Sequence, residues 1–272
     1  MTRHEPQLTK TTGESEPFKE QKLRRSLTRS GADPDQVDEV VREVTKRLRD
    51  GMATTEVFRI AHRLLRRERR AAAARYSLQR AIQQLGPDGI PFEKFIAELW
   101  RSAGFRTRTG VRLQGRFVRH EVDIIAKRGD DSRFAECKFR SQNDGKVDIK
   151  VALYVFARAA DIRTRWEGNF WLVTNGRFTK DALTYGEGVG LQLLAWDHPQ
   201  GAGLRDQIDR AGLHPVTAIS TLHHKEQLAL LRRGIVLAAA LRDQRDVIHE
   251  LGISDRRSKE LWREIDELRM EK

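Results

Sequence analysis

The 272-residue sequence contains a single cysteine, which excludes an intramolecular disulfide and a structural zinc site built on cysteine. It also has no long hydrophobic run. Its longest apolar stretch, residues 234–241, is far too short to span a bilayer. The first five residues have no apolar core, so no secretory signal is expected. We therefore expect a cytoplasmic protein with no membrane partner.

Charge is abundant and unbalanced. Charged residues make up 33% of the chain, and 51 basic against 39 acidic side chains give a net charge of +12. The excess lies mainly in residues 1–85, which carry 19 basic and 12 acidic side chains. Positive charge attracts phosphates through long-range attraction and counterion release. The composition favours a nucleic-acid or nucleotide partner, although a solvated basic surface is the alternative.

Residues 6–85 are predicted to form a short extended or hairpin segment over 8–18 and three helices. The helices cover about 19–30, 34–50 and 54–84. Asp33 is the expected N-cap of the second helix, and Pro34 fits the first helical position because that position needs no amide donor. The run Gly86-Pro87-Asp88-Gly89 breaks the pattern and predicts a domain boundary.

Residues 90–200 alternate between helical and strand patterns. Helices are expected over 91–103, 147–162 and 178–187, and strands over 105–113, 116–126, 133–139, 169–174 and 191–196. This order predicts an α/β arrangement with a mixed sheet flanked by helices. Residues 201–272 are predicted to be helical, in segments that include 204–211, 222–231, 235–241, 246–251 and 255–269. The fold class is thus a multidomain α+β or α/β protein, with domains 1–85, 88–200 and 201–272.

Two acidic residues and a lysine are the clearest chemical signal. Glu136 and Lys138 are two residues apart on a predicted strand, so they share one face while Cys137 points the other way. Asp123 lies on the preceding strand. Paired carboxylates suit Mg²⁺, and a nearby lysine can orient or deprotonate a water for phosphodiester hydrolysis. A polar strand face with a Lys138–Asp123 salt bridge and no catalysis is the alternative, and the residues alone leave both readings open.

Residues 90–200 resemble the PD-(D/E)xK nuclease superfamily, in particular restriction-endonuclease-like domains of the Mrr type. The resemblance is carried by the helix at 90–105, the Val122–Ala126 strand and Glu136-Cys137-Lys138. It implies that Asp123 and Glu136 ligate Mg²⁺ or Mn²⁺, with help from the Cys137 carbonyl. It also implies that Lys138 positions the attacking water. Val122 stands where the superfamily's label has proline, a departure that is common in the superfamily.

The resemblance also implies a role for a helix glutamate, which Glu93 matches; an exposed helix residue is the alternative. His120 could aid phosphate binding or water activation, but a structural role is favoured. Lys146, Asp148 and Lys150 could face DNA or could simply be solvated. The Cys137 side chain is expected in the core and not as a nucleophile.

A second set of residues lies near the N-terminus. A glycine turn at Gly13 brings Lys10 and Lys22 toward one pocket at the mouth of a helical bundle, with Glu16 between them in sequence. Triphosphate binding needs such cations and backbone donors. Lysines near a turn are often only solvated, so this signal is weak by itself.

Residues 6–80 resemble the ATP-cone, a regulatory nucleotide-binding domain. The spacing of Lys10, Gly13, Phe18 and Lys22 carries the resemblance. It implies that ATP or dATP binds near these residues, with Glu16 contacting the ribose or ordering the lysines, and with contact from Thr54 at the start of the third helix. Thr11-Thr12 replaces the family's usual arginine-aspartate, which removes one cation and leaves the choice between ATP and dATP open.

The segments around 230–235 and 248–254 faintly resemble helix-hairpin-helix DNA-binding domains, although a packing or dimerisation module is an equal alternative. Taken together, the sequence predicts a metal-dependent DNA endonuclease that ATP or dATP regulates. It would act as a homo-oligomer in the restriction of foreign or modified DNA. The main alternative is a non-catalytic, nucleotide-responsive DNA-binding regulator, and a ribonuclease is a third hypothesis.

Overall fold

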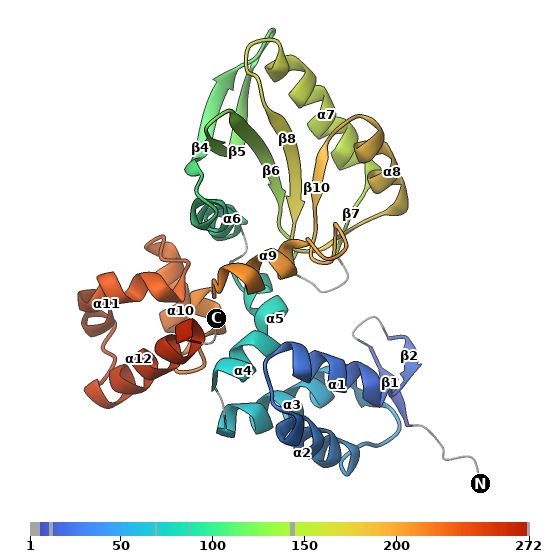
Figure 1. Cartoon of the computed structure of the whole chain (residues 1–272), viewed down its shortest axis with the longest axis vertical. Helices are drawn as coiled ribbons and strands as arrows, with labels where there is room; N and C mark the ends of the chain where they lie inside the picture. Colours follow the sequence, from blue (N-terminus) through green and yellow to red (C-terminus); the bar gives the residue numbers. More distant parts are fainter. Residues whose placement is uncertain (1–5, 11–12, 69, 87, 142–144, 271–272) are drawn as a thin grey trace. The chain divides into compact units, whose positions relative to one another are not determined.

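The computed structural model describes residues 6–10, 13–68, 70–86, 88–141 and 145–270 (Figure 1). The chain divides into two compact units, Met1–Leu78 with Glu260–Glu271, and Gln79–Lys259. The sequence-based division into three domains at 85 and 200 stays a prediction. Within the described residues, no helix has the length and apolar character needed to cross a membrane.

The larger unit is built on a mixed five-stranded sheet in the order β10-β8-β6-β5-β4. Its strands are β4 (Arg106–Gln114), β5 (Arg119–Arg128), β6 (Asp131–Lys138), β8 (Asn169–Thr174) and β10 (Gln192–Leu194). The first three strands are antiparallel to one another, whereas β8 runs parallel to both β6 and β10. The predicted mixed sheet is therefore confirmed.

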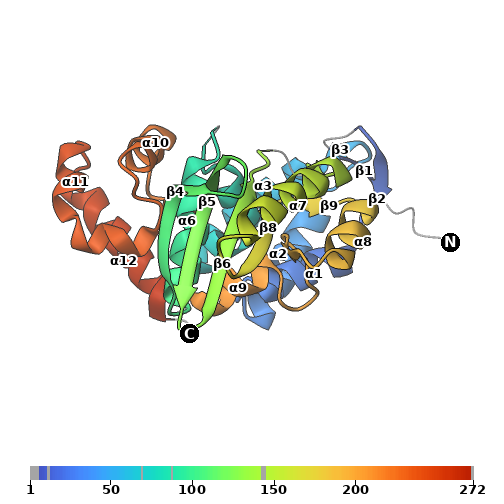
Figure 2. The ribbon, with the colours of Figure 1, turned by 90° about the horizontal axis from the view of Figure 1, so that it is seen from above.

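Helices cover this sheet (Figure 2). α6 (Ile90–Ser102) packs against β4 and β5, α7 (Ile149–Arg163) packs against β8, and α8 (Lys180–Gly188) packs against β10. The short strands β7 (Lys146–Val147) and β9 (Arg177–Phe178) pair in parallel just before α7 and α8. Large apolar side chains such as Phe92 and Phe95 of α6 and Leu172 of β8 are fully buried. Burial of these side chains fixes α6 and β8 in place.

The C-terminal part is helical, as predicted. It contains α9 (Leu204–Ala211), η1 (Val216–Ala218), α10 (His224–Arg232), η2 (Ala238–Asp243), α11 (Arg245–Glu250) and α12 (Asp255–Met270). One element differs from the expectation. The segment predicted as a helix over 235–241 becomes a 3₁₀ turn from Ala238. Its start is displaced because Pro215 and Leu237 form an isolated bridge.

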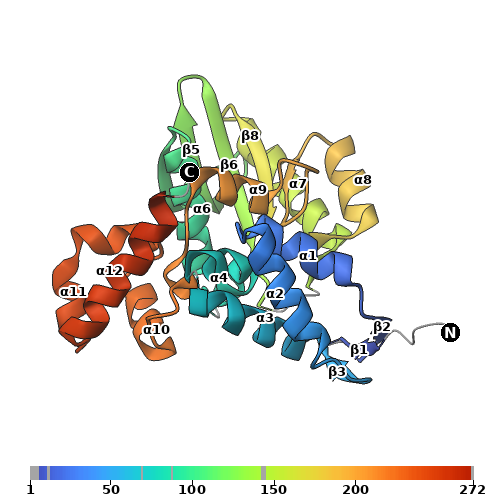
Figure 3. The same cartoon turned by 60° about the horizontal axis from the view of Figure 1, so that its bottom comes forward.

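The smaller unit joins a small sheet to a helical bundle (Figure 3). β1 (Gln7–Thr9) pairs antiparallel with β2 (Ser15–Pro17), which confirms the predicted hairpin. β3 (Met52–Ala53) adds to β1 in parallel, and its two residues are too few to give a sequence pattern. The bundle is formed by α1 (Glu20–Arg29), α2 (Pro34–Thr45), α3 (Thr54–Glu68) and α4 (Arg70–Tyr76).

The helix ends follow local chemistry. The Asp33 carboxylate accepts a hydrogen bond from the Gln36 backbone N–H at 2.9 Å, and the Gln36 side chain accepts one from Asp33 in return. This capping box and Pro34 confirm the predicted start of α2. The single helix predicted over 54–84 is wrong, because α3, α4 and α5 (Leu78–Gln83) occupy that range. Ser77, between α4 and α5, donates its hydroxyl to the Ala74 carbonyl at 3.0 Å, the kind of bond by which serine competes with a continuing helix.

Candidate active site

The ends of β5 and β6 bring two carboxylates together. The β5–β6 ladder pairs Ile124 with Ala135, so Asp123 and Glu136 follow immediately on the two neighbouring strands. The Cys137 backbone N–H donates a hydrogen bond to Asp123 Oδ2 at 2.7 Å. Asp123 is therefore held by the main chain of the strand that carries the other acid.

Glu136 lies between two cations. Its side chain is only 9% exposed, and Lys138 Nζ donates to Oε1 at 2.7 Å. The other carboxylate oxygen accepts from the guanidinium of Arg158 on α7. The alternative salt bridge from Lys138 to Asp123 is thus not the arrangement found, since the lysine pairs with Glu136.

Arg158 was missed by the sequence reasoning. Besides Glu136, it donates to the Glu121 carbonyl at 2.9 Å and lies over the Tyr154 ring, 4.7 Å from its centroid. The available signal was the Tyr154–Arg158 spacing of one helical turn on α7, which places the two on one helix face. That signal says nothing about which strand the face contacts.

Helix α6 supplies the third acid. Gly89 precedes the helix with a left-handed φ of +79°, and Glu93 lies in its first turn. Glu93, Asp123, Glu136 and Lys138 all line one cavity of about 280 Å³. Burial, followed by the negative charges of Asp123 and Glu136, raises the pKa of Glu93 to about 8.

The same environment acts on Asp123. Burial and the charge of Glu136 raise its pKa to about 6, against the lowering effect of the Cys137 N–H. Burial also raises the pKa of the Cys137 thiol well above its usual value, which keeps the thiol protonated and unreactive. The prediction that the Cys137 side chain lies in the core agrees with its burial.

The residues fit a hard divalent cation. Over the described ranges, no three His, Cys, Asp or Glu side chains are arranged as a complete metal-binding group. Mg²⁺ does not require one, because it is commonly held by one or two carboxylates with waters and substrate phosphate. Asp123 and Glu136 supply two carboxylates in one cavity, and the charge of Glu136 helps to raise the pKa of Asp123. A bound cation would relieve the repulsion between the two negative charges.

His120 occupies a structural position. Its Nε2 lies 2.7 Å from Asp161 Oδ2 on α7, and the backbone N–H groups of Phe117 and Val118 donate to the same carboxylate. Burial would raise the pKa of Asp161, but the hydrogen bonds from His120 and the two N–H groups lower it. The contact between His120 and Asp161 therefore ties the β4–β5 turn to α7.

The charged residues around the start of α7 do not line the cavity. Asp148 is the N-cap of α7 and accepts from the Val151 N–H at 3.3 Å. Lys146 and Lys150 are exposed. The structure thus gives Asp148 a capping role and leaves the two lysines as solvated charges or as DNA contacts.

The predicted nucleotide-binding residues form a cluster at the β1–β2 hairpin. Glu16 Oε2 lies 3.8 Å from Lys10 Nζ and 3.3 Å from Lys22 Nζ, and Lys10 also pairs with Glu14 at 3.0 Å. Gly13 turns the hairpin with a φ of +86°, and Thr54 begins α3. Thr11 and Thr12 lie outside the described residues. Glu16 is thus ion-paired with both lysines, and its contact with nucleotide stays a prediction.

Three family models match successive parts of the chain. An ATP cone domain matches residues 6–85, a restriction endonuclease domain matches 87–200, and an AF1548-like C-terminal domain matches 214–269. An uncharacterized protein of Archaeoglobus fulgidus is 30% identical over 168 residues, which cover 61% of this chain and 95% of the relative. The protein belongs to the same family as this Archaeoglobus fulgidus protein. The predicted succession of an ATP-cone and an Mrr-type restriction endonuclease domain is confirmed.

Solved structures extend the comparison. The crystal structure of AF1548, described as a protein of unknown function, is 28% identical, has a TM-score of 0.55, and covers 66% of this chain and 96% of its own. The MspJI restriction endonuclease in complex with a 27-mer oligonucleotide is 16% identical, with a TM-score of 0.34, over 74% of this chain and 44% of its own. The catalytic and nucleotide-binding roles of single residues stay predictions.

Proposed function

We propose that this protein is a DNA endonuclease of the PD-(D/E)xK type that depends on Mg²⁺ or Mn²⁺. The convergence of Glu93, Asp123, Glu136 and Lys138 on one cavity is the observation that carries the proposal. These residues come from one helix and two strands of the restriction endonuclease domain. A salt bridge alone would not need three carboxylates around one lysine.

The side chains divide the work of hydrolysis among them. Asp123 and Glu136, with the Cys137 carbonyl, would hold the cation. When bound, the cation supplies charge neutralisation for the phosphate and acidifies a water. Lys138 orients the attacking water and stabilises charge on the phosphate from its place beside Glu136. Glu93 lines the same cavity from helix α6 and completes the polar surface that positions the water.

DNA is the proposed substrate, and restriction of foreign or modified DNA is the proposed role. The net charge of +12 favours a polyanion, and the restriction endonuclease domain favours DNA over other phosphodiesters. ATP or dATP bound near Lys10, Glu16 and Lys22 would regulate cleavage, through the assembly of a homo-oligomer or through access of DNA.

One observation favours the alternative of a non-catalytic DNA-binding regulator. Both oxygens of Glu136 are engaged by cationic side chains, Lys138 and Arg158, as in a closed structural network. A scaffold would keep this network and bind DNA without cleaving it. The alternative explains Glu136 and Lys138, but it gives no reason for the raised pKa values of the half-buried Glu93 and Asp123.

Cleavage of supercoiled plasmid decides between the endonuclease and the non-catalytic regulator. We expect the wild-type protein to nick or cut plasmid with Mg²⁺ and to stop when a chelator is added. Lys138→Met should lose cleavage while it keeps DNA binding, and Glu98→Gln serves as a control because Glu98, a partly exposed residue of α6 paired with Arg101, lies outside the cavity. DNA binding without cleavage of unmodified or methylated plasmid, with and without ATP, would favour the regulator.

A further inference from the structure

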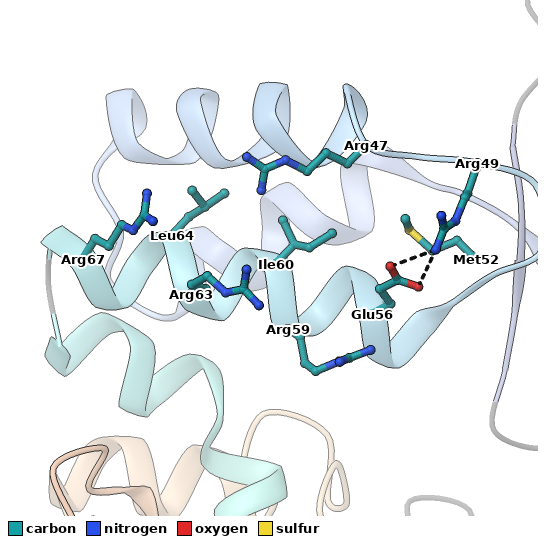
Figure 4. Close-up of a pocket in the computed structure, with 9 residues that line it drawn as sticks. All are labelled: Arg47, Arg49, Met52, Glu56, Arg59, Ile60, Arg63, Leu64 and Arg67. Atoms are coloured by element: carbon teal, nitrogen blue, oxygen red, sulfur yellow. Dashed lines mark hydrogen bonds and ion pairs between the residues drawn. The ribbon is translucent and has the colours of Figure 1, made fainter.

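A cationic cleft lies in the smaller unit, between the segment that follows α2 and one face of α3. It has a volume of about 500 Å³. Figure 4 shows the guanidinium groups of Arg47, Arg63 and Arg67 around Ile60 and Leu64. Arg49 and Arg59 also line the cleft, and Glu56 is its single acidic residue. Five arginines against one carboxylate make the lining of the cleft strongly cationic.

Two of these arginines are neutralised and three are not. Arg49 pairs with Glu56 at 3.2 Å, and Arg47 pairs with Glu43 at 3.1 Å. Arg59, Arg63 and Arg67 are exposed and have no carboxylate partner within the part of the chain that the structure describes. Like charges four residues apart destabilise a helix. The three arginines therefore destabilise α3 unless an anion neutralises their charge.

The three unpaired arginines lie four residues apart along α3. Four residues of helix rise about 6 Å, so Arg59, Arg63 and Arg67 span about 12 Å along α3. Each guanidinium can grip a phosphate with two parallel hydrogen bonds. Ile60 and Leu64 supply apolar surface beside the row. A row of cations along an apolar strip matches an anion whose charges repeat along a line.

The cleft is separate from the predicted nucleotide-binding residues. Lys10, Glu16, Lys22 and Thr54 are absent from its lining. On other sides of α3, Phe58 stacks on Tyr76 of α4 with ring centroids 5.0 Å apart, while Val57 and Ala61 are buried in the core. The arginine row thus belongs to a face of α3 that neither the core nor the hairpin cluster uses.

We propose that this cleft binds the phosphodiester backbone of DNA. The repeated phosphates of a strand match the row of Arg59, Arg63 and Arg67, and the deoxyribose groups between phosphates match Ile60 and Leu64. A triphosphate places its charges at one end of the molecule and would leave part of the row unpaired. Contacts of this kind add affinity without reading sequence. The N-terminal domain then holds DNA as well as a nucleotide, independently of whether the chain cleaves DNA.

The test is DNA affinity of the full-length protein as a function of salt, measured in EDTA with a labelled duplex. The variant is Arg59→Gln/Arg63→Gln/Arg67→Gln. The matched control removes three exposed cations of the same unit outside the cleft, in Arg25→Gln/Arg42→Gln/Lys46→Gln. We expect the cleft variant to bind DNA at least about tenfold more weakly, and the slope of log affinity against log salt to become shallower by about 2.7.

The control triple should keep the wild-type slope, and both triples should keep wild-type ATP affinity and circular dichroism. An unchanged slope in a folded cleft variant overturns the proposal. So does a cleft variant that loses ATP affinity and keeps DNA affinity, because the cleft is then a nucleotide site. The expected change in slope between wild type and the cleft variant would support the proposal even if the protein cleaves no DNA, because the experiment measures binding alone.

Discussion

The backbone N–H of Cys137 holds Asp123 through a 2.7 Å hydrogen bond to Oδ2. The bond crosses from β6 to β5 just beyond the pair formed by Ile124 and Ala135, since Asp123 is one residue from Ile124 and Cys137 is two residues from Ala135. Asp123 is thus oriented by main chain, and the Cys137 side chain has no part in the contact. A substitution of the Cys137 side chain should therefore leave the hydrogen bond to Asp123 in place.

Asp123→Asn should abolish cleavage, while Cys137→Ala should retain it. The asparagine keeps the size of the side chain but removes the charge that the cation needs, so the cleavage rate should fall at least about 100-fold. The alanine leaves the backbone donor in place and removes only a buried thiol. Plasmid cleavage at saturating Mg²⁺ measures both. A Cys137→Ala protein that is folded but inactive would give the thiol a role that this account denies.

Glu93 should make the stability of the metal-free protein fall as pH rises. Its pKa is raised from 4.5 to about 8 on folding, so the folded state holds a proton that the unfolded state has lost. The resulting stabilisation is complete below pH 4.5 and disappears as pH rises through about 8. Asp123 acts with the same sign between 3.8 and about 6, which leaves the range above pH 6.5 mainly to Glu93.

Thermal melts from pH 6.5 to 8.5 in EDTA measure this effect. Glu93→Gln should flatten the fall in Tm, and Glu98→Gln on the same helix should not. Mg²⁺ should also flatten the wild-type profile, because a cation among the carboxylates favours their ionised forms. A wild-type profile that is as flat as that of Glu93→Gln would show that the raised pKa is absent.

Lys22→Gln and Lys10→Gln should each weaken ATP binding about tenfold, since each removes one cation from a triphosphate. Both lysines lie beside Glu16, whose carboxylate holds them near one another. Calorimetric titration of the full-length protein with ATP and with dATP measures the affinities. Arg25→Gln is the control, as an exposed cation on α1. Equal affinity in all four proteins would place the nucleotide elsewhere.

His120→Ala should reduce stability without changing the chemistry of cleavage. The imidazole is one of three donors to Asp161, and its loss weakens the tie between the β4–β5 turn and α7. We expect a lower Tm by several degrees, with a cleavage rate within about threefold of wild type at a temperature well below the transition, as for a residue outside the reacting groups. A large loss of rate in a stable protein would make His120 part of the catalytic site.

The strand pattern could place Glu136 and Lys138 on one face because strand periodicity is short-range. Glu136 and Lys138 share a face wherever β6 packs, and their contact follows from their separation of two residues. Asp123 could be placed beside them because a short turn joins β5 to β6. Helix α6 could be placed only through the family resemblance, since no local pattern says which strands a helix covers.

Other features depend on contacts between distant segments and have no local signal. Arg158 reaches Glu136 from 22 residues away because α7 packs on the sheet. β3 is strand only because it pairs with β1, more than 40 residues earlier. The predicted 54–84 helix breaks at Ser77, where the hydroxyl donates to the Ala74 carbonyl, and propensity averaged over a window cannot resolve such a local contact.

The account rests on Asp123 and Glu136 holding the cation that DNA cleavage needs. Its most direct test is the rate of plasmid cleavage as a function of Mn²⁺ concentration, together with calorimetric Mn²⁺ binding, for wild type, Glu136→Gln and the Glu98→Gln control. The account predicts saturable cleavage and binding with a common midpoint in wild type and control, and the loss of both in Glu136→Gln. Cleavage by Glu136→Gln at the wild-type rate and midpoint would contradict it.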